Sequence, residues 1–114
     1  MKKPKQKIIL KGIPASVGIV KGKIRIILDP SQCSKMKEGD ILVTEMTNPL
    51  FTPAIVKASG IVVDLGGVLS HSAVVARELG IPAVVGTGKA TKVLKDNMLI
   101  TIDGRKGIIY AKTK

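Results

Sequence analysis

The hydrophobic pattern predicts strands of two kinds. In residues 18–28 the basic side chains of Lys21, Lys23 and Arg25 occupy alternate positions between apolar residues and glycine. A period of two predicts a strand with one solvent-exposed face. A short apolar run at residues 8–10 predicts another strand near the start of the chain.

Three later runs, at residues 41–44, 61–64 and 83–85, are short and almost entirely apolar. Strands that are buried on both faces, as in a parallel sheet, have this composition. The intervals between the runs are long enough for helices. The pattern therefore predicts a β-α-β-α-β unit with right-handed crossovers over residues 41–85.

Each interval contains signals for the start of a helix. In the first interval, Thr52 is placed to cap a helix that begins at Pro53 and stops at Gly60. In the second interval, Ser70 is a good N-cap, so we expect His71 to be the first helical residue.

The second helix is predicted to end at Gly80 and to bury a stripe formed by Val75, Ala76 and Leu79. A short helix is expected at residues 89–95. The runs 98–103 and 107–110 predict a hairpin that turns at residues 104–106, whereas GIPASVG, between the first two strands, is typical of a turn and residues 31–40 of a surface connection.

These elements predict a mixed α/β fold, with a small parallel sheet, helices on it, and antiparallel strands from both ends of the chain. Residues 1–6 are polar and basic, typical of a flexible terminus, and residues 7–114 form one domain. With 114 residues, 45% of them hydrophobic, the chain is long enough to bury a single core.

The net charge is +11, from 19 Lys and Arg against 8 Asp and Glu. The lysines are scattered, and Phe51 and Tyr110 are the only aromatic residues, so stacking platforms for nucleic acid are not expected. A single cysteine, Cys33, excludes an internal disulfide and fits the reducing cytoplasm. No apolar run approaches the ~20 residues of a membrane span.

The only histidine, His71, follows a loop that contains Gly66 and Gly67 and stands at the predicted helix start. Ligands of β-α units gather at such loops, and the free N–H groups of a helix start favour phosphate. Histidine is largely neutral at physiological pH, so a ring nitrogen is available as a nucleophile. The alternative is a capping or packing histidine. Asp64 or a backbone carbonyl is placed to orient the ring, and no second histidine or cysteine pair supports a metal site.

The segment GGVLSHSAVVARELGIPAVVG resembles the phosphohistidine signature of the mobile, swivelling domain of PEP-utilising enzymes. The segments GIPASVGIVKGKIRII, GDILVTEMTNPLFTPAIVKASGIVVD and ATKVLKDNMLITIDGRKGIIY resemble the opening, central and closing parts of that domain. The resemblance implies a swivelling β/β/α three-layer fold and a phosphoryl carrier that moves between a nucleotide site and an acceptor site.

Carried over to this sequence, the resemblance makes His71 the phosphorylated residue and Gly66, Gly67 and Ser70 its supporting loop. Arg77 occupies the family's arginine position. From the helical geometry alone, a phosphate contact and a bracing contact to a carboxylate are both open for Arg77, and Glu78 is more typical of a structural role.

Two threonines, Thr47 and Thr52, precede the first predicted helix, and a contact to the imidazole or the phosphate is open for each of them. Capping is the role their type and position favour. One departure from the family concerns Leu69, which occupies a position where many members have a threonine that is in some cases regulatory. Control by phosphorylation at that position is therefore not expected.

The resemblance implies that ATP and Mg²⁺ bind to a partner, because no ATP-grasp domain or PEP/pyruvate-binding barrel is visible in the sequence. We therefore expect a stand-alone phosphohistidine subunit of a phosphoenolpyruvate synthase- or dikinase-like phosphotransferase. The subunit would be incomplete as a catalyst and would work with an ATP-grasp subunit and a PEP/pyruvate or other acceptor subunit. The alternatives are a binding or regulatory module that keeps the fold, and a small subunit of a dehydratase that resembles the aconitase swivel.

Overall fold

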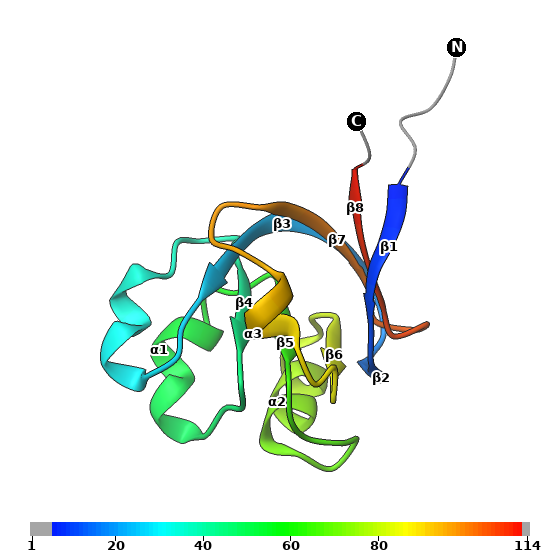
Figure 1. Cartoon of the computed structure of the whole chain (residues 1–114). Coiled ribbons are helices and arrows are strands. Elements are labelled where there is room, and N and C mark those ends of the chain that lie inside the picture. The colour runs from blue at the N-terminus through cyan, green and yellow to red at the C-terminus, as the bar shows by residue number, and fades with distance from the viewer. Residues whose placement is uncertain (1–5, 113–114) are drawn as a thin grey trace.

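The computed structural model describes residues 6–112, and in this range the chain forms one eight-stranded sheet with short helices packed on it (Figure 1). The strand order is β1-β8-β7-β3-β4-β5-β6-β2. In chain order the elements are β1 (Gln6–Lys11), β2 (Ile13–Ser16), β3 (Ile19–Ile26), the 3-10 helix η1 (Pro30–Lys35), β4 (Ile41–Thr44), the 3-10 helix η2 (Pro49–Phe51), α1 (Thr52–Ile55), β5 (Gly60–Val63), α2 (His71–Leu79), β6 (Ala83–Val85), α3 (Ala90–Val93), β7 (Leu99–Asp103) and β8 (Ile108–Lys112).

The parallel half of the sheet consists of β3, β4, β5 and β6, and it confirms the prediction from the three apolar runs. All residues of β4, β5 and β6 are buried. One face of these strands, which includes Leu42 and Ile61, packs against η1, α1 and α2. The other face, which includes Val43 and Val62, packs against the antiparallel strands. Burial on both faces explains why these runs contain almost no polar residue.

The antiparallel half consists of β1, β8 and β7, and β3 joins it to the parallel half. Residues 19–23 of β3 pair with β7, and residues 24–26 pair with β4. The hairpin predicted for residues 98–110 is confirmed as β7 and β8. The molecule therefore has the expected three layers: an antiparallel layer, a parallel layer and helices. The exception is α3, whose Ala90 lies in the core between the two strand layers rather than on the face that carries α2.

The stretch GIPASVG, predicted as a turn, contains the strand β2. β1 and β2 are separated only by Gly12, and they pair with β8 at one side of the sheet and β6 at the other. A Cβ at position 12 would lie 2.6 Å from the carbonyl oxygen of Val85, so only glycine fits this close passage. The prediction was wrong because this pairing joins segments far apart in sequence.

Residues 31–40 were predicted as a surface connection, but η1 contributes to the core. Cys33 and Met36 are buried in the same cluster as Phe51 and Ile55. Their apolar positions are too few to show a period in the sequence, which is why the pattern did not indicate burial.

Gln6 belongs to β1, so the flexible terminus predicted for residues 1–6 is wrong at this residue, and residues 1–5 lie outside the described part of the chain. The outer ends of β1 and β8 lie side by side, with Gln6 paired to Lys112. The loop between β5 and α2 lies at the opposite end of the molecule in Figure 1. In the described range, no helix is long and apolar enough to cross a lipid bilayer.

Candidate functional site

The loop from Asp64 to Ser70 carries the chain from the buried end of β5 to the start of α2. Gly66 has a φ of +109°, a conformation that L side chains rarely adopt, and a Cβ there would lie 2.9 Å from Ser70 Oγ. Ser70 closes the turn, because its N–H and its hydroxyl both donate to the carbonyl oxygen of Gly67, at 3.0 and 2.7 Å. The loop thus has a defined shape that needs glycine at position 66.

α2 begins at His71 with Ser70 at the N-cap position, as predicted, and Gly80 ends it in the left-handed conformation. Ser70 makes no side-chain capping bond, since its hydroxyl is used on Gly67. The N–H groups of the first turn of α2 therefore have no side-chain acceptor from their cap. Such groups, with the positive end of the helix dipole, favour a bound anion.

The buried face of α2 differs from the predicted stripe of Val75, Ala76 and Leu79. Leu79 is half exposed and Val75 only partly buried. The fully covered positions are Ser72, Ala73 and Ala76, which have small side chains. Small residues let the helix lie close to the sheet, and this changes which residues face inward.

Thr47, in the loop after β4, is the residue that holds the His71 ring. Its Oγ1 lies 2.8 Å from His71 Nδ1 and 2.5 Å from the hydroxyl oxygen of Ser72. Thr47 is buried, and His71 is partly exposed. The capping role favoured for Thr47 is wrong, because the side chain of Asn48 accepts from the N–H of Leu50 at the start of η2.

Neither Asp64 nor Thr52 has a hydrogen bond to the histidine. The carboxylate of Asp64 accepts from Thr87 and Thr91, where it fixes the segment that leads into α3. Thr52 is exposed and donates to the carbonyl oxygen of Pro49, and the helical turn already begins at η2, so the predicted cap at Thr52 is wrong. Within residues 6–112, no three His, Cys, Asp or Glu side chains come together as a metal site would require.

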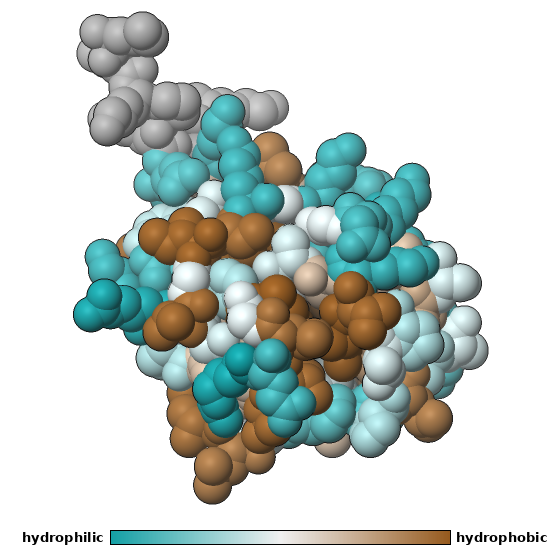
Figure 2. Space-filling model, turned by 180° about the vertical axis from the view of Figure 1, so that it is seen from behind, coloured by the Kyte–Doolittle hydropathy of each residue, from teal (hydrophilic) through white to brown (hydrophobic). Residues whose placement is uncertain are grey.

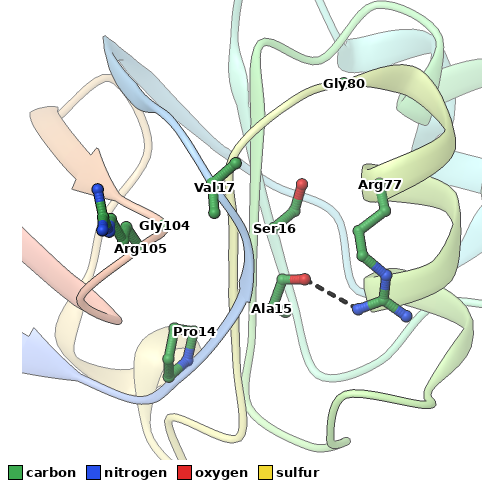
Figure 3. Close-up of a pocket in the computed structure, with 8 residues that line it drawn as sticks. All are labelled: Pro14, Ala15, Ser16, Val17, Arg77, Gly80, Gly104 and Arg105. Carbon is green, nitrogen blue, oxygen red and sulfur yellow. Dashed lines mark hydrogen bonds between the residues drawn. The ribbon is translucent and has the colours of Figure 1, made fainter.

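Arg77 binds backbone carbonyl groups rather than a carboxylate. Its guanidinium donates to Ala15 in β2 at 2.9 Å and to Val68 in the β5–α2 loop at 2.6 Å. The bond to Ala15 is drawn in Figure 3. Arg77 therefore ties the loop that precedes His71 to the edge strand β2. The sequence left a phosphate contact and a brace open, and the contacts are those of a brace.

Arg77 also lines a groove of about 460 Å³ together with residues of β2 and of the β7–β8 turn (Figure 3). The groove is bounded by Pro14, Ala15, Ser16, Val17, Arg77, Gly80, Gly104 and Arg105. His71, Ser70 and Thr47 are not among its lining residues. The groove and the histidine are thus separate features of the surface.

The connection between β4 and α1 and the loop between β5 and α2 expose apolar side chains. We call these five residues the apolar collar: Met46, Leu50, Leu65, Val68 and Leu69, which are 50–88% exposed. Figure 2 shows apolar surface at the end of the molecule where the β5–α2 loop lies. Residues 45–52 and 64–74 contain none of the chain's 19 lysines and arginines, and their only charged side chains are those of Glu45 and Asp64.

Sequence reasoning missed Ser72 and the collar. The signal for Ser72 was a serine in the second position of α2, because serine is unfavourable within a helix unless its hydroxyl has a partner. The signal for the collar was the run of apolar residues in segments expected to be loops, where exposure is the default.

The family comparison matches residues 36–107 to the PEP-utilising enzyme, mobile domain. The chain belongs to this family. Three curated relatives extend the match along nearly the whole chain. A probable phosphoenolpyruvate synthase of Archaeoglobus fulgidus is 58% identical over 91% of this chain, and the phosphoenolpyruvate synthase of Pyrococcus furiosus is 56% identical over 90%. An uncharacterised phosphotransferase of Bacillus subtilis is 50% identical over 86%. The chain spans only 12–14% of the length of these relatives.

Solved structures support the three-layer fold. The solution structure of an Enzyme I protein matches 68% of this chain and 32% of its own, with a TM-score of 0.58 and 35% identity. The aconitase X of Thermococcus kodakaraensis matches 96% of this chain and 99% of its own, with a TM-score of 0.61. At 16% identity, this second likeness shows the fold alone. The mixed α/β fold expected from the sequence is confirmed.

Proposed function

We propose that this chain is a phosphohistidine carrier, in which His71 accepts a phosphoryl group on Nε2 and passes it to a second molecule. The observation that carries the proposal is the hydrogen bond between Nδ1 and Thr47, which leaves Nε2 as the ring nitrogen without a hydrogen-bond partner in the described chain. A regulatory module has no need of a partly exposed imidazole that is oriented in this way.

The transfer step follows from this geometry. In the attacking ring the proton is on Nδ1, and the lone pair of Nε2 forms a bond to phosphorus while the bond from phosphorus to the donor's leaving oxygen breaks. The electron pair of that bond stays on the leaving oxygen. The N–H groups at the start of α2 and the helix dipole stabilise the phosphoryl oxygens as they approach. Thr47 keeps the ring in the orientation that this attack requires.

A partner supplies the rest of the site. Phosphoryl transfer depends on positive charge around the phosphate groups, and residues 45–52 and 64–74, which contain Thr47 and His71, include no lysine or arginine. We therefore place ATP and Mg²⁺ on an ATP-grasp domain or subunit, and phosphoenolpyruvate and pyruvate on a second partner. The relatives named as phosphoenolpyruvate synthases support this choice of substrates.

The apolar collar gives those partners a surface to bind. Burial of exposed apolar side chains stabilises association and excludes water from the reacting group. Excluding water matters for a carrier, because water competes with the acceptor for the phosphoryl group. The buried free thiol of Cys33 is consistent with the cytoplasm, where we place the protein.

The test is a replacement in the Pyrococcus furiosus phosphoenolpyruvate synthase, whose matching region is 56% identical over 103 residues. The matching region is exchanged for residues 6–112 of this chain. We expect the chimera to make phosphoenolpyruvate and to take up ³²P that is labile to acid and stable to alkali. ATP labelled on the β or on the γ phosphoryl group, and labelled phosphoenolpyruvate, show which compound loads His71.

The variants His71→Ala and His71→Gln in the chimera should carry no acid-labile label. Glu78→Gln, an exposed change on the same helix, serves as the control and should label like the parent. Equal label on the His71 variants would show that another residue carries the phosphoryl group.

A further inference from the structure

Behind the His71 ring lies a pair of buried hydroxyl groups. Thr47 Oγ1 is within hydrogen-bond distance of both His71 Nδ1 and Ser72 Oγ, and Thr47 and Ser72 are only 4% and 2% exposed. Within the described chain, Thr47 is the only hydrogen-bond partner of the Ser72 hydroxyl. Each hydroxyl has one hydrogen to donate, so the three groups form a chain with a direction.

Only one direction gives every hydroxyl hydrogen an acceptor. If Ser72 donates to Thr47 and Thr47 donates to Nδ1, both hydrogens are used. If Nδ1–H donates to Thr47 and Thr47 donates to Ser72, the hydrogen of Ser72 has no acceptor in a buried position. An unsatisfied buried donor is unfavourable. The contacts therefore favour a ring whose Nδ1 accepts a hydrogen bond.

A ring with an accepting Nδ1 is what phosphorylation at Nε2 produces. Once the phosphoryl group is bonded to Nε2 and the proton on Nδ1 has been released, the neutral ring has its lone pair on Nδ1. We propose that Ser72 is a positioning residue: it donates to Thr47 and so orients the Thr47 hydroxyl as a donor to Nδ1. Together the two hydroxyl groups slow hydrolysis of the phosphorylated ring and thereby preserve it. This role in preserving the phosphorylated ring rests on the function proposed above, whereas the direction of the hydrogen bonds does not.

The protection has a chemical cause. In hydrolysis, water attacks phosphorus, the bond from phosphorus to Nε2 breaks, and its electron pair returns to Nε2. A proton on Nδ1 favours this step, because the ring then leaves as neutral imidazole. While Thr47 donates to Nδ1, the lone pair of Nδ1 is occupied by this hydrogen bond. A proton can bind to Nδ1 only after the hydrogen bond has been broken. Loading needs the opposite direction and a proton on Nδ1, so the ring releases its Nε2 proton to water and takes one up on Nδ1 while the two hydroxyl groups rotate. After transfer the Nδ1 proton is released to solvent, and the hydroxyl groups rotate back.

The first experiment measures the direction in the unphosphorylated chain. His71 is the only histidine, so ¹⁵N spectra of the imidazole need no assignment. At a pH where the ring is neutral, we expect wild type to show Nδ1 as the unprotonated nitrogen. Ser72→Ala should increase the fraction with a proton on Nδ1, because Ser72 no longer polarises the Thr47 hydroxyl. A wild-type ring protonated mainly on Nδ1 would overturn the proposal.

The second experiment measures the lifetime of the phosphorylated ring. Phosphoramidate, a small-molecule donor, phosphorylates His71 without any partner protein, and ³¹P NMR follows its hydrolysis. We expect Ser72→Ala to shorten the half-life about 2-fold and Thr47→Val to shorten it about 2- to 10-fold, as the loss of one hydrogen bond implies. Thr47→Ser keeps the hydroxyl and should restore the wild-type half-life.

A double-mutant cycle tests whether Ser72 acts through Thr47. In the Thr47→Val background, Ser72→Ala should cause no further shortening of the half-life. If it does, or if Ser72→Ala alone leaves both the tautomer and the half-life unchanged in a folded protein, the proposal is wrong. These readouts do not depend on a donor protein, so their failure is distinct from a failure of the labelling test in the chimera.

Discussion

At the scale of single residues, the site depends on a few atoms whose positions the backbone dictates. Gly66 is needed because its φ is positive and because a Cβ would press against Ser70. The neighbouring Gly67 has no such constraint, since φ is not positive and a Cβ there would meet no atom within 4 Å. The two glycines, equal in the sequence motif, therefore have unequal roles.

Gly66→Ala should destabilise the fold by about 1–3 kcal/mol, through backbone strain and displacement of Ser70. It should also slow labelling of His71, since Ser70 precedes it. Gly67→Ala is the matched control and should change the unfolding free energy by less than about 1 kcal/mol. Chemical denaturation of both variants measures the difference. Equal destabilisation would contradict the assignment of the turn to Gly66.

At the scale of elements, the β5–α2 loop is held by α2 and by an edge strand. Arg77 links Val68 in that loop to Ala15 in β2. β2 in turn pairs with β6, so the loop position depends on the edge of the sheet. A side chain six residues after the histidine thus affects its presentation without touching it.

Arg77→Lys should lower the unfolding free energy by about 1 kcal/mol, because one ammonium group does not bridge both carbonyl groups and the site is partly exposed to water. Hydrogen exchange should become faster in residues 64–70. Glu78→Gln changes an exposed residue that follows Arg77 on the helix, and it should leave the unfolding free energy and the hydrogen exchange of residues 64–70 unchanged. If exchange in this loop is unaffected by Arg77→Lys, the bridge does not hold it.

At the scale of the whole molecule, charge and hydrophobicity are divided between regions. A chain with a net charge of +11 has no lysine or arginine in residues 45–52 and 64–74, the two segments that contain Thr47, His71 and the apolar collar. The β5–α2 loop and the paired ends of β1 and β8 lie at opposite ends of the fold in Figure 1. This arrangement suits a domain that presents one tip to partners.

Leu69→Ser should reduce the rate at which a partner loads His71 by about tenfold. The Leu69 side chain is 88% exposed in the free chain, so its burial stabilises only the complex with the partner, and the serine loses that contribution. Its own fold should be unaffected. Ile19→Ser, at a 72% exposed position in β3 of the antiparallel layer, is the control. Labelling rates in the chimera compare the two. A larger effect of Ile19→Ser would place the docking surface elsewhere.

The sequence by itself determined the features that local pattern encodes. The runs at 41–44, 61–64 and 83–85 predicted buried parallel strands because burial on both faces excludes polar residues. Ser70 and Gly80 marked the ends of α2, since caps are set by neighbours in the chain. The motif around His71 was sufficient to indicate the family, because its residues are contiguous in the chain.

Only the tertiary structure decided how the site is assembled. Thr47 reaches His71 across 24 positions, and Ser72 faces inward because small residues let α2 approach the sheet. Arg77 reaches Ala15 across 62 positions. Such contacts form between segments that folding brings together, so no local propensity or period contains them. The role of the histidine could thus be predicted from the sequence, whereas the hydroxyl pair that positions it could be identified only in the folded structure.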